Sequence, residues 1–301
     1  MTNAVWASAD PWQLAAFAAL TLALIALWLP RQLAMSSRLP WWGVFFAGAL
    51  VAAAIAQLVD LLGLVALLAL GASCVLARGI RRGPFRVVAH AVMLSLCAAL
   101  LLHAVPGFDN PRVLDAVLVS PNAVPYTKYL NFDKGVVGLF VLGLYAPDRA
   151  ARDPLRRYVP QLLWQFAAVA SVVLLLSLAA GFVRWEPKFP AWSPAWLWSM
   201  VFLTALPEET MFRGLAQEWL TNRLGLGSRS GVFAAIAVGV AFGVAHLAGG
   251  PVYVALAAVA GAGYGWIYAS TGSLAAAIVV HAGLNTLQFV FFTYPALALP
   301  T

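Results

Sequence analysis

Three short motifs in the last third of the chain place acid, base and amide side chains inside otherwise apolar stretches. The residues concerned are Glu208, Glu209, Arg213, Phe242, His246, His281 and Asn285. If these stretches cross a bilayer, each ionisable group costs about 2.5–3.5 kcal/mol on insertion scales, which marks it as a functional-site candidate. Carboxylate and imidazole groups can activate water, and N–H donors can stabilise the oxyanion that forms when water attacks a carbonyl.

Helical spacing gives the two adjacent glutamates different partners. Glu209 precedes Arg213 by four residues, so the two share a helix face in the orientation that favours an ion pair. Glu208 lies about 100° around the helix and lacks this partner. We therefore expect Glu209 to stay ionised and hold the geometry, and Glu208 to act as the general base that activates water.

The histidine motifs supply the remaining groups. Phe242 and His246 are four residues apart, as are His281 and Asn285, so each pair shares one face of its helix. We expect His246 to position or share the water. We expect His281 and Asn285 to donate N–H groups to the oxyanion. Because the motifs lie on three separate apolar runs, these runs must converge around one hydrated chamber.

Composition indicates the environment in which these motifs work. Hydrophobic residues make up 63% of the 301-residue chain and charged residues 10%, and the mean hydropathy is +0.87. A soluble domain carries about 25% charged residues, so the chain is predicted to be an integral membrane protein. The net charge of +7 fits basic cytoplasmic loops, and we therefore expect no nucleic-acid partner.

Transmembrane helices must position the motifs, and we predict an all-α polytopic bundle of nine or ten spans. Nine apolar runs are long enough to cross a bilayer, and a tenth, at 135–146, is short. The positive-inside rule favours ten crossings, because most of the arginines then fall on one side. We divide the chain into N-terminal spans at 1–190, with an extracytoplasmic loop near 106–134, and a catalytic core at 191–301. Within that core, the last three to four spans carry the motifs.

The three motifs resemble the signatures of the CPBP family. This family contains the CAAX-type prenyl endopeptidases and their bacteriocin-processing or immunity relatives, and is also called the Abi group. The motifs read Glu208-Glu209-x-x-x-Arg213, Phe242-x-x-x-His246 and His281-x-x-x-Asn285, and the resemblance covers about residues 196–292. It implies an intramembrane endopeptidase with a polar cavity open to the bilayer, in which the motif residues have the roles given above.

The resemblance leaves two hydrolytic mechanisms open. Members of the family were long regarded as metalloproteases, and two histidines with a carboxylate can hold zinc with an open position. A glutamate mechanism without metal is the alternative. We expect no cofactor, because Asn285 is a poor zinc ligand and Arg213 makes a second cation beside the carboxylates costly.

The expected substrate is a hydrophobic peptide or a membrane protein, held in the lipid bilayer. The alanine and tryptophan content is typical of bacteria, so we expect a multi-pass protein of the bacterial inner (cytoplasmic) membrane with a substrate other than a prenylated CAAX protein. Two other functions stay open, a non-catalytic membrane scaffold or immunity protein and a transporter. No internal repeat supports the transporter, and the sequence does not determine the oligomeric state.

Overall fold

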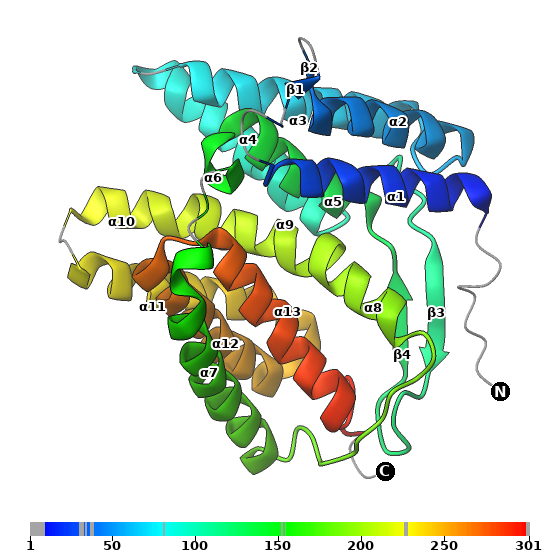
Figure 1. The fold of residues 1–301 in the computed structure, drawn as a ribbon, viewed down its shortest axis with the longest axis vertical. Coiled ribbons are helices and arrows are strands. Elements are labelled where there is room, and N and C mark those ends of the chain that lie inside the picture. Colours follow the sequence, from blue (N-terminus) through cyan, green and yellow to red (C-terminus); the bar gives the residue numbers. More distant parts are fainter. Residues whose placement is uncertain are drawn as a thin grey trace.

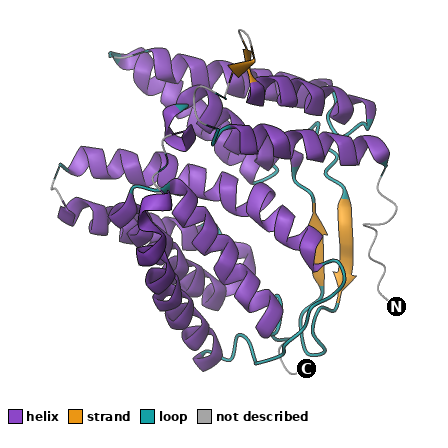
Figure 2. Cartoon of the chain, viewed as in Figure 1, coloured by secondary structure: helices purple, strands orange, loops and turns teal. Residues whose placement is uncertain are grey.

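The structure is a computed structural model that describes residues 10–29, 33, 35–36, 39–80, 82–151, 153, 155–225 and 228–298. Within these residues the chain is mostly helical, with two short two-stranded sheets. Figure 1 shows the helices packed into one bundle, and Figure 2 shows how small a part the strands form. The count of arginines on the two sides of the membrane, which favoured ten crossings, includes Arg31, Arg38, Arg81 and Arg152. These four residues lie outside the described residues.

Four helices form the N-terminal part of the bundle. They are α1 (Pro11–Ala26), α2 (Trp41–Ile55), α3 (Leu61–Gly79) and α4 (Pro84–Leu101), and the pair β1 (Met35–Ser36) and β2 (Leu39–Pro40) precedes α2. Asp60 starts α3, because its carboxylate accepts hydrogen bonds from the backbone N–H groups of Leu62 and Gly63. Helix α1 packs along α2, and α3 packs along α4 (Figure 1).

A β-hairpin occupies the segment that the sequence predicted as a loop near 106–134. Strand β3 (Arg112–Val117) pairs antiparallel with β4 (Tyr126–Tyr129), and α5 (Phe132–Phe140) and the π-helix η2 (Val141–Tyr145) follow. The sequence did not predict this hairpin, because its strands are short and their register is irregular. Val113 and Leu114 of β3 are buried in the main core, so the hairpin is an integral part of the fold.

One long helical run carries the first motif. After α6 (Asp148–Ala151), η3 (Leu155–Tyr158) and α7 (Val159–Ala179), the run consists of α8 (Ser193–Met200), η4 (Val201–Ala205), α9 (Leu206–Glu209), η5 (Thr210–Gln217) and α10 (Glu218–Leu224). The segments η4 and η5 are π-helical. Pro207 cannot donate a backbone hydrogen bond, which predicts a local irregularity, and the two wide turns lie on either side of it.

The second motif begins on α11 (Ser228–Val244) and ends at His246, just after this helix, and the third lies on α13 (Leu274–Phe291). The segments η6 (Leu247–Gly249) and α12 (Gly250–Thr271) lie between them. Helices α11 and α12 approach closely at glycines. A Cβ atom added at Gly239 would lie 2.5 Å from the backbone nitrogen of Ala262, and one at Gly243 would lie 2.5 Å from the carbonyl oxygen of Val254. Small residues therefore let these two backbones pack against each other.

Five described helices are long and apolar enough to cross a membrane. They are Leu61–Gly79, Pro84–Leu101, Asp148–Ala179, Leu247–Thr271 and Leu274–Phe291, and three shorter apolar helices accompany them. Leu61, Leu68 and Phe85 are about three quarters exposed, which is the behaviour of side chains that face lipid. The polytopic helical bundle is thus confirmed. The total of nine or ten crossings stays a prediction, because helix length and composition do not place a bilayer.

Two hydrophobic cores meet at α13. The larger joins the N-terminal helices and the hairpin to α8 and α9, and the smaller joins α7 to the last three helices. Ile278 belongs to the first core and Val280 to the second. The side chain of Trp198 in α8 donates to Thr21 of α1 at 3.0 Å, so helices on both sides of residue 190 share one core. The division into two parts at that residue stays a prediction.

Candidate active site

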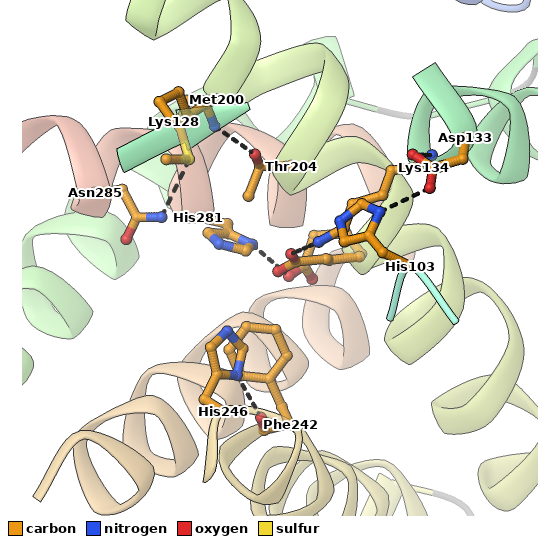
Figure 3. Close-up of polar contacts among 12 residues, drawn as sticks. His103, Lys128, Asp133, Lys134, Met200, Thr204, Phe242, His246, His281 and Asn285 are labelled. Carbon is orange, nitrogen blue, oxygen red and sulfur yellow. Dashed lines mark hydrogen bonds and ion pairs between the residues drawn. The ribbon is translucent and has the colours of Figure 1, made fainter. Parts of the chain in front are cut away.

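A cavity of about 1270 Å³ lies between the C-terminal helices and the β-hairpin. Its lining includes Glu208 of α9, His246 after the end of α11, and His281 and Asn285 of α13. Figure 3 shows the three labelled side chains of this group, those of His246, His281 and Asn285, around a common space. The fold therefore brings together the side chains that the motifs distribute over three separate helices.

Glu209 and Arg213 form an ion pair outside the lining of this cavity. Arg213 Nε lies 3.2 Å from Glu209 Oε2, and Arg213 Nη1 donates to Oε1 at 3.3 Å, with both side chains completely buried. The guanidinium Cζ also lies 5.2 Å from the ring centroid of Phe242 and 5.5 Å from that of Tyr264. The expected i,i+4 pair is present. The aromatic rings around it offset part of the cost of burying the guanidinium group.

His281 is tied to this ion pair. Its Nδ1 donates to Glu209 Oε1 at 2.8 Å, and the ring of Tyr264 stacks on it with centroids 4.8 Å apart and an interplanar angle of 13°. The sequence did not predict this contact with Glu209. A carboxylate bound at Nδ1 fixes the orientation of the ring, and His281 also lines the cavity. Glu209 therefore holds His281 in place at the cavity wall.

His246 is held by a backbone carbonyl of the preceding helical turn. Its Nδ1 donates to the carbonyl of Phe242 at 2.7 Å, so in the neutral ring Nε2 carries the lone pair. The rings of Phe242 and Tyr253 contact it, with centroid distances of 4.6 Å and 5.5 Å. His246 therefore presents a hydrogen-bond acceptor held in place on three sides, which is suited to orienting a water molecule.

Glu208 has no contact with Arg213, as the helical spacing predicts, but it has another cationic neighbour. Its Oε1 lies 3.8 Å from Nζ of Lys134, at the start of α5. Its Oε2 is buried and accepts no hydrogen bond from the described residues. Buried carboxylate oxygens normally have partners, so this acceptor is available to a water molecule in the cavity.

Residues 190–287 match the family model described as Rce1-like, type II CAAX prenyl endopeptidase Rce1-like. This segment, about a third of the chain, is similar in sequence to that family and is hereafter named the Rce1-like domain. The match contains all three motifs and confirms the resemblance to the CPBP family, which ties the chain at family level to CAAX-type intramembrane proteases. With the apolar helices, it identifies a multi-pass integral membrane protein. Comparison with curated proteins and with solved structures gave no match.

Asn285 of the Rce1-like domain has a weak partner. Its Nδ2 lies 3.3 Å from Sδ of Met200, and a thioether is a poor hydrogen-bond acceptor. Figure 3 shows this contact together with His281 on the same helix. The amide is therefore held near the cavity without being committed to a strong hydrogen bond, and it can turn to a better acceptor at small cost.

Two lysines upstream of the Rce1-like domain also line the cavity, and sequence reasoning missed both. Lys134 contacts Glu208, and Lys128 of β4 donates from Nζ to Thr204 Oγ1 at 3.3 Å. Burial lowers the pKa of Lys128 to about 8, and repulsion by Lys134 adds to this, while attraction by Glu208 opposes it. Neither lysine belongs to a motif, so only the contacts of β4 with α8 and η4, and of α5 with α9, reveal them.

A buried carboxylate anchors the start of α5 beside Lys134. Asp133 is 1% exposed, and its Oδ2 accepts from His103 Nδ1 at 2.7 Å while its Oδ1 accepts from Asn110 at 3.1 Å. Figure 3 shows Asp133 and His103 next to Lys134. These hydrogen bonds tie the segment between α4 and β3 to the start of α5, and so fix the position from which Lys134 reaches Glu208.

The absence of a metal cofactor stays a prediction, and the spacing of the described side chains bears on it. Among the residues that the structure describes, no group of three or more His, Cys, Asp and Glu side chains is close enough to hold one ion. Glu209 and His281 are bonded to each other, and Arg213 occupies the remaining side of that carboxylate. A divalent ion bound there would lie against a buried guanidinium, which like-charge repulsion opposes.

Proposed function

We propose that the protein is an intramembrane endopeptidase that hydrolyses a peptide bond of a hydrophobic or membrane-associated protein in this cavity, with water activated by Glu208. The Rce1-like domain supports a CAAX-type protease at family level. The observation that carries the proposal is the position of Glu208 on the wall of the same cavity as His246, His281 and Asn285, with one buried carboxylate oxygen that has no protein partner.

The first step is attack by water. Glu208 accepts one proton from the water, and the lone pair of His246 Nε2 accepts a hydrogen bond from the other. The oxygen then bonds to the carbonyl carbon of the substrate, and the carbonyl electrons move to its oxygen. Lys134 Nζ, at 3.8 Å from Glu208 Oε1, helps to hold the carboxylate in position for this step.

The second step is collapse of the tetrahedral intermediate. The amide of Asn285 donates a hydrogen bond to the oxyanion, and His281, held in place by Glu209, does the same when its Nε2 carries a proton. Asn285 exchanges its contact with Met200 for this stronger acceptor. When the carbonyl re-forms, the C–N bond breaks and the proton held by Glu208 passes to the leaving nitrogen. No metal takes part in either step.

The walls of the cavity support an apolar substrate. Leu174 of α7, Leu256 of α12 and Leu284 of α13 line it along with the polar groups. A hydrophobic peptide segment buries apolar surface against such walls, and the polar groups select the bond that is cut.

We place the protein in the bacterial inner membrane, as its composition suggests.

The experiment uses the purified protein in liposomes with a set of hydrophobic peptides and membrane-protein fragments, and cleavage is measured by mass spectrometry. Glu208→Gln is expected to lower cleavage by at least about 100-fold. Glu186→Gln, an equal change at a glutamate outside the cavity lining, is expected to retain it. A chelator is expected to leave the activity unchanged. Cleavage at the original rate by Glu208→Gln, or loss of activity that added zinc restores, would refute the mechanism.

A further inference from the structure

Lys128 is a buried cation without an anionic partner. Its side chain is 8% exposed and lines the cavity, and its Nζ donates to Thr204 Oγ1 at 3.3 Å. Among the described residues, no carboxylate lies within ion-pair distance of this ammonium group. An ammonium group has three N–H donors, and a neutral hydroxyl occupies one of them. Buried charges in proteins are normally paired, so this part of the cavity is electrostatically incomplete.

The charged groups nearby do not form an ion pair with Lys128. Glu208 is the acidic group whose attraction Lys128 feels, and its Oε1 already faces Lys134. Lys134 adds a second positive charge to the same wall, and Asp109, which also lines the cavity, is not within ion-pair distance of either lysine. Glu208 therefore pairs with Lys134, and neither carboxylate of this wall contacts Lys128, whose positive charge can attract an anion.

The position of Thr204 relates this charge to the chemistry. Thr204 precedes Glu208 by four residues on the same helical run, so the two side chains lie about one turn apart on one face. A group bound by Lys128 and Thr204 would consequently lie within a few residues of the peptide bond that Glu208 addresses. One ammonium and one hydroxyl match a singly charged carboxylate better than a phosphate, which proteins usually bind with several donors or with arginine.

We propose that Lys128 and Thr204 form a binding site for a carboxylate of the substrate, close to the bond that is cut. This inference rests on the proposed endopeptidase function for its biological meaning, but binding can be measured without cleavage. The carboxylate has two possible sources, the C-terminal carboxylate of a peptide and an acidic side chain near its end.

The test measures the affinity of fluorescent hydrophobic peptides for the unchanged protein and for Glu208→Gln in liposomes. Three peptides share one sequence: the first ends in a free acid, the second in an amide, and the third ends in an amide but carries glutamate in place of a terminal glutamine. We expect at least one carboxylate peptide to bind about 10- to 100-fold more tightly than the neutral amide. The peptide that shows this preference identifies the source of the carboxylate. Equal affinities for all three would overturn the proposal.

Substitutions test whether the tighter binding of carboxylate peptides depends on Lys128. Lys128→Met is expected to lose it, and Lys128→Arg, which keeps the charge, is expected to retain it. Lys188→Met is the matched control, because Lys188 is another shielded lysine, bonded to the carbonyl of Phe292 outside the cavity lining. Retention of the preference by Lys128→Met would overturn the proposal. The comparison of peptides on the unchanged protein needs no variant, so it decides the question even if a substituted chain does not fold.

The two proposals fail separately. A carboxylate preference in a protein that cleaves none of the peptides would remove the endopeptidase mechanism and leave the binding site. Cleavage that depends on Glu208 but treats acid and amide peptides alike would remove the binding site and leave the mechanism.

Discussion

Replacement of Lys128 by methionine is expected to stabilise the folded protein, although it removes a cavity residue. The pKa of Lys128 falls from 10.5 to about 8 on folding, mainly because of burial. This difference corresponds to a cost of about 3 kcal/mol for keeping the group protonated in the fold. The variant loses the hydrogen bond to Thr204, which contributes about 1 kcal/mol. The expected net gain at pH 7 is therefore about 2 kcal/mol.

The lowered pKa of Lys128 also determines how the stability of the folded protein changes with pH. Below pH 8 both the folded and the unfolded chain hold the proton on Lys128, so the folded protein bears the full cost. Between pH 8 and 10.5 the unfolded chain binds this proton and the folded chain releases it, so stability rises with pH. The advantage of Lys128→Met should therefore be largest below pH 8 and should disappear as the pH approaches 10.5.

The assay is guanidinium unfolding in detergent micelles, followed by tryptophan fluorescence, at several pH values between 6 and 10. Lys128→Arg is the control, because it keeps a buried cation and should gain nothing. The reasoning is refuted if Lys128→Met unfolds at a lower denaturant concentration than the unchanged protein at pH 7. A stability difference that does not change with pH would refute it as well, because the cost would then not come from the buried charge.

Three further predictions concern the ion pair, the water-orienting histidine and the helix packing. Arg213→Met leaves Glu209 buried without its cation and should destabilise the protein by about 3–5 kcal/mol in the same assay, whereas a double change that also replaces Glu209 by leucine should recover much of this loss. His246→Gln should lower kcat about 100-fold or more with little change in KM, measured with a cleaved peptide, and a parallel loss of binding would argue against a role in positioning water. Gly239→Ala should destabilise the α11–α12 contact by about 1–3 kcal/mol, while Gly48→Ala, where the added Cβ meets nothing within 4 Å, should be neutral or slightly stabilising; equal effects would contradict the packing argument.

Patterns within single segments of the sequence predicted the helices and the contacts between residues that are close in the chain. The ten apolar runs correspond to helices, because burial in lipid or in a core requires each run to satisfy its own backbone hydrogen bonds. The four-residue spacing of Glu209 and Arg213 predicted their ion pair correctly. The spacing of Phe242 and His246 predicted one helix face, but α11 ends at Val244, and His246 contacts Phe242 from the turn that follows. Both contacts join residues that are four positions apart.

Contacts between distant segments could not be predicted in this way. The hairpin at 112–129 depends on pairing between two short strands, and its Lys128 reaches the cavity because β4 contacts α8 and η4. The bond of His281 to Glu209 joins residues 72 positions apart, and the contact of Asn285 with Met200 joins residues 85 apart. The sequence placed His281 and Asn285 as free donors, and the fold gives each of them a partner.

Single-turnover cleavage in water enriched in oxygen-18 tests the central claim most directly. If Glu208 activates water as a base, the new C-terminal carboxylate of the product carries oxygen-18 from the first turnover, and Glu208→Gln yields almost no product. An unlabelled first product would mean that a protein oxygen attacks the carbonyl, and equal cleavage by the two proteins would mean that Glu208 has no catalytic role. Either result would contradict the mechanism proposed for this cavity.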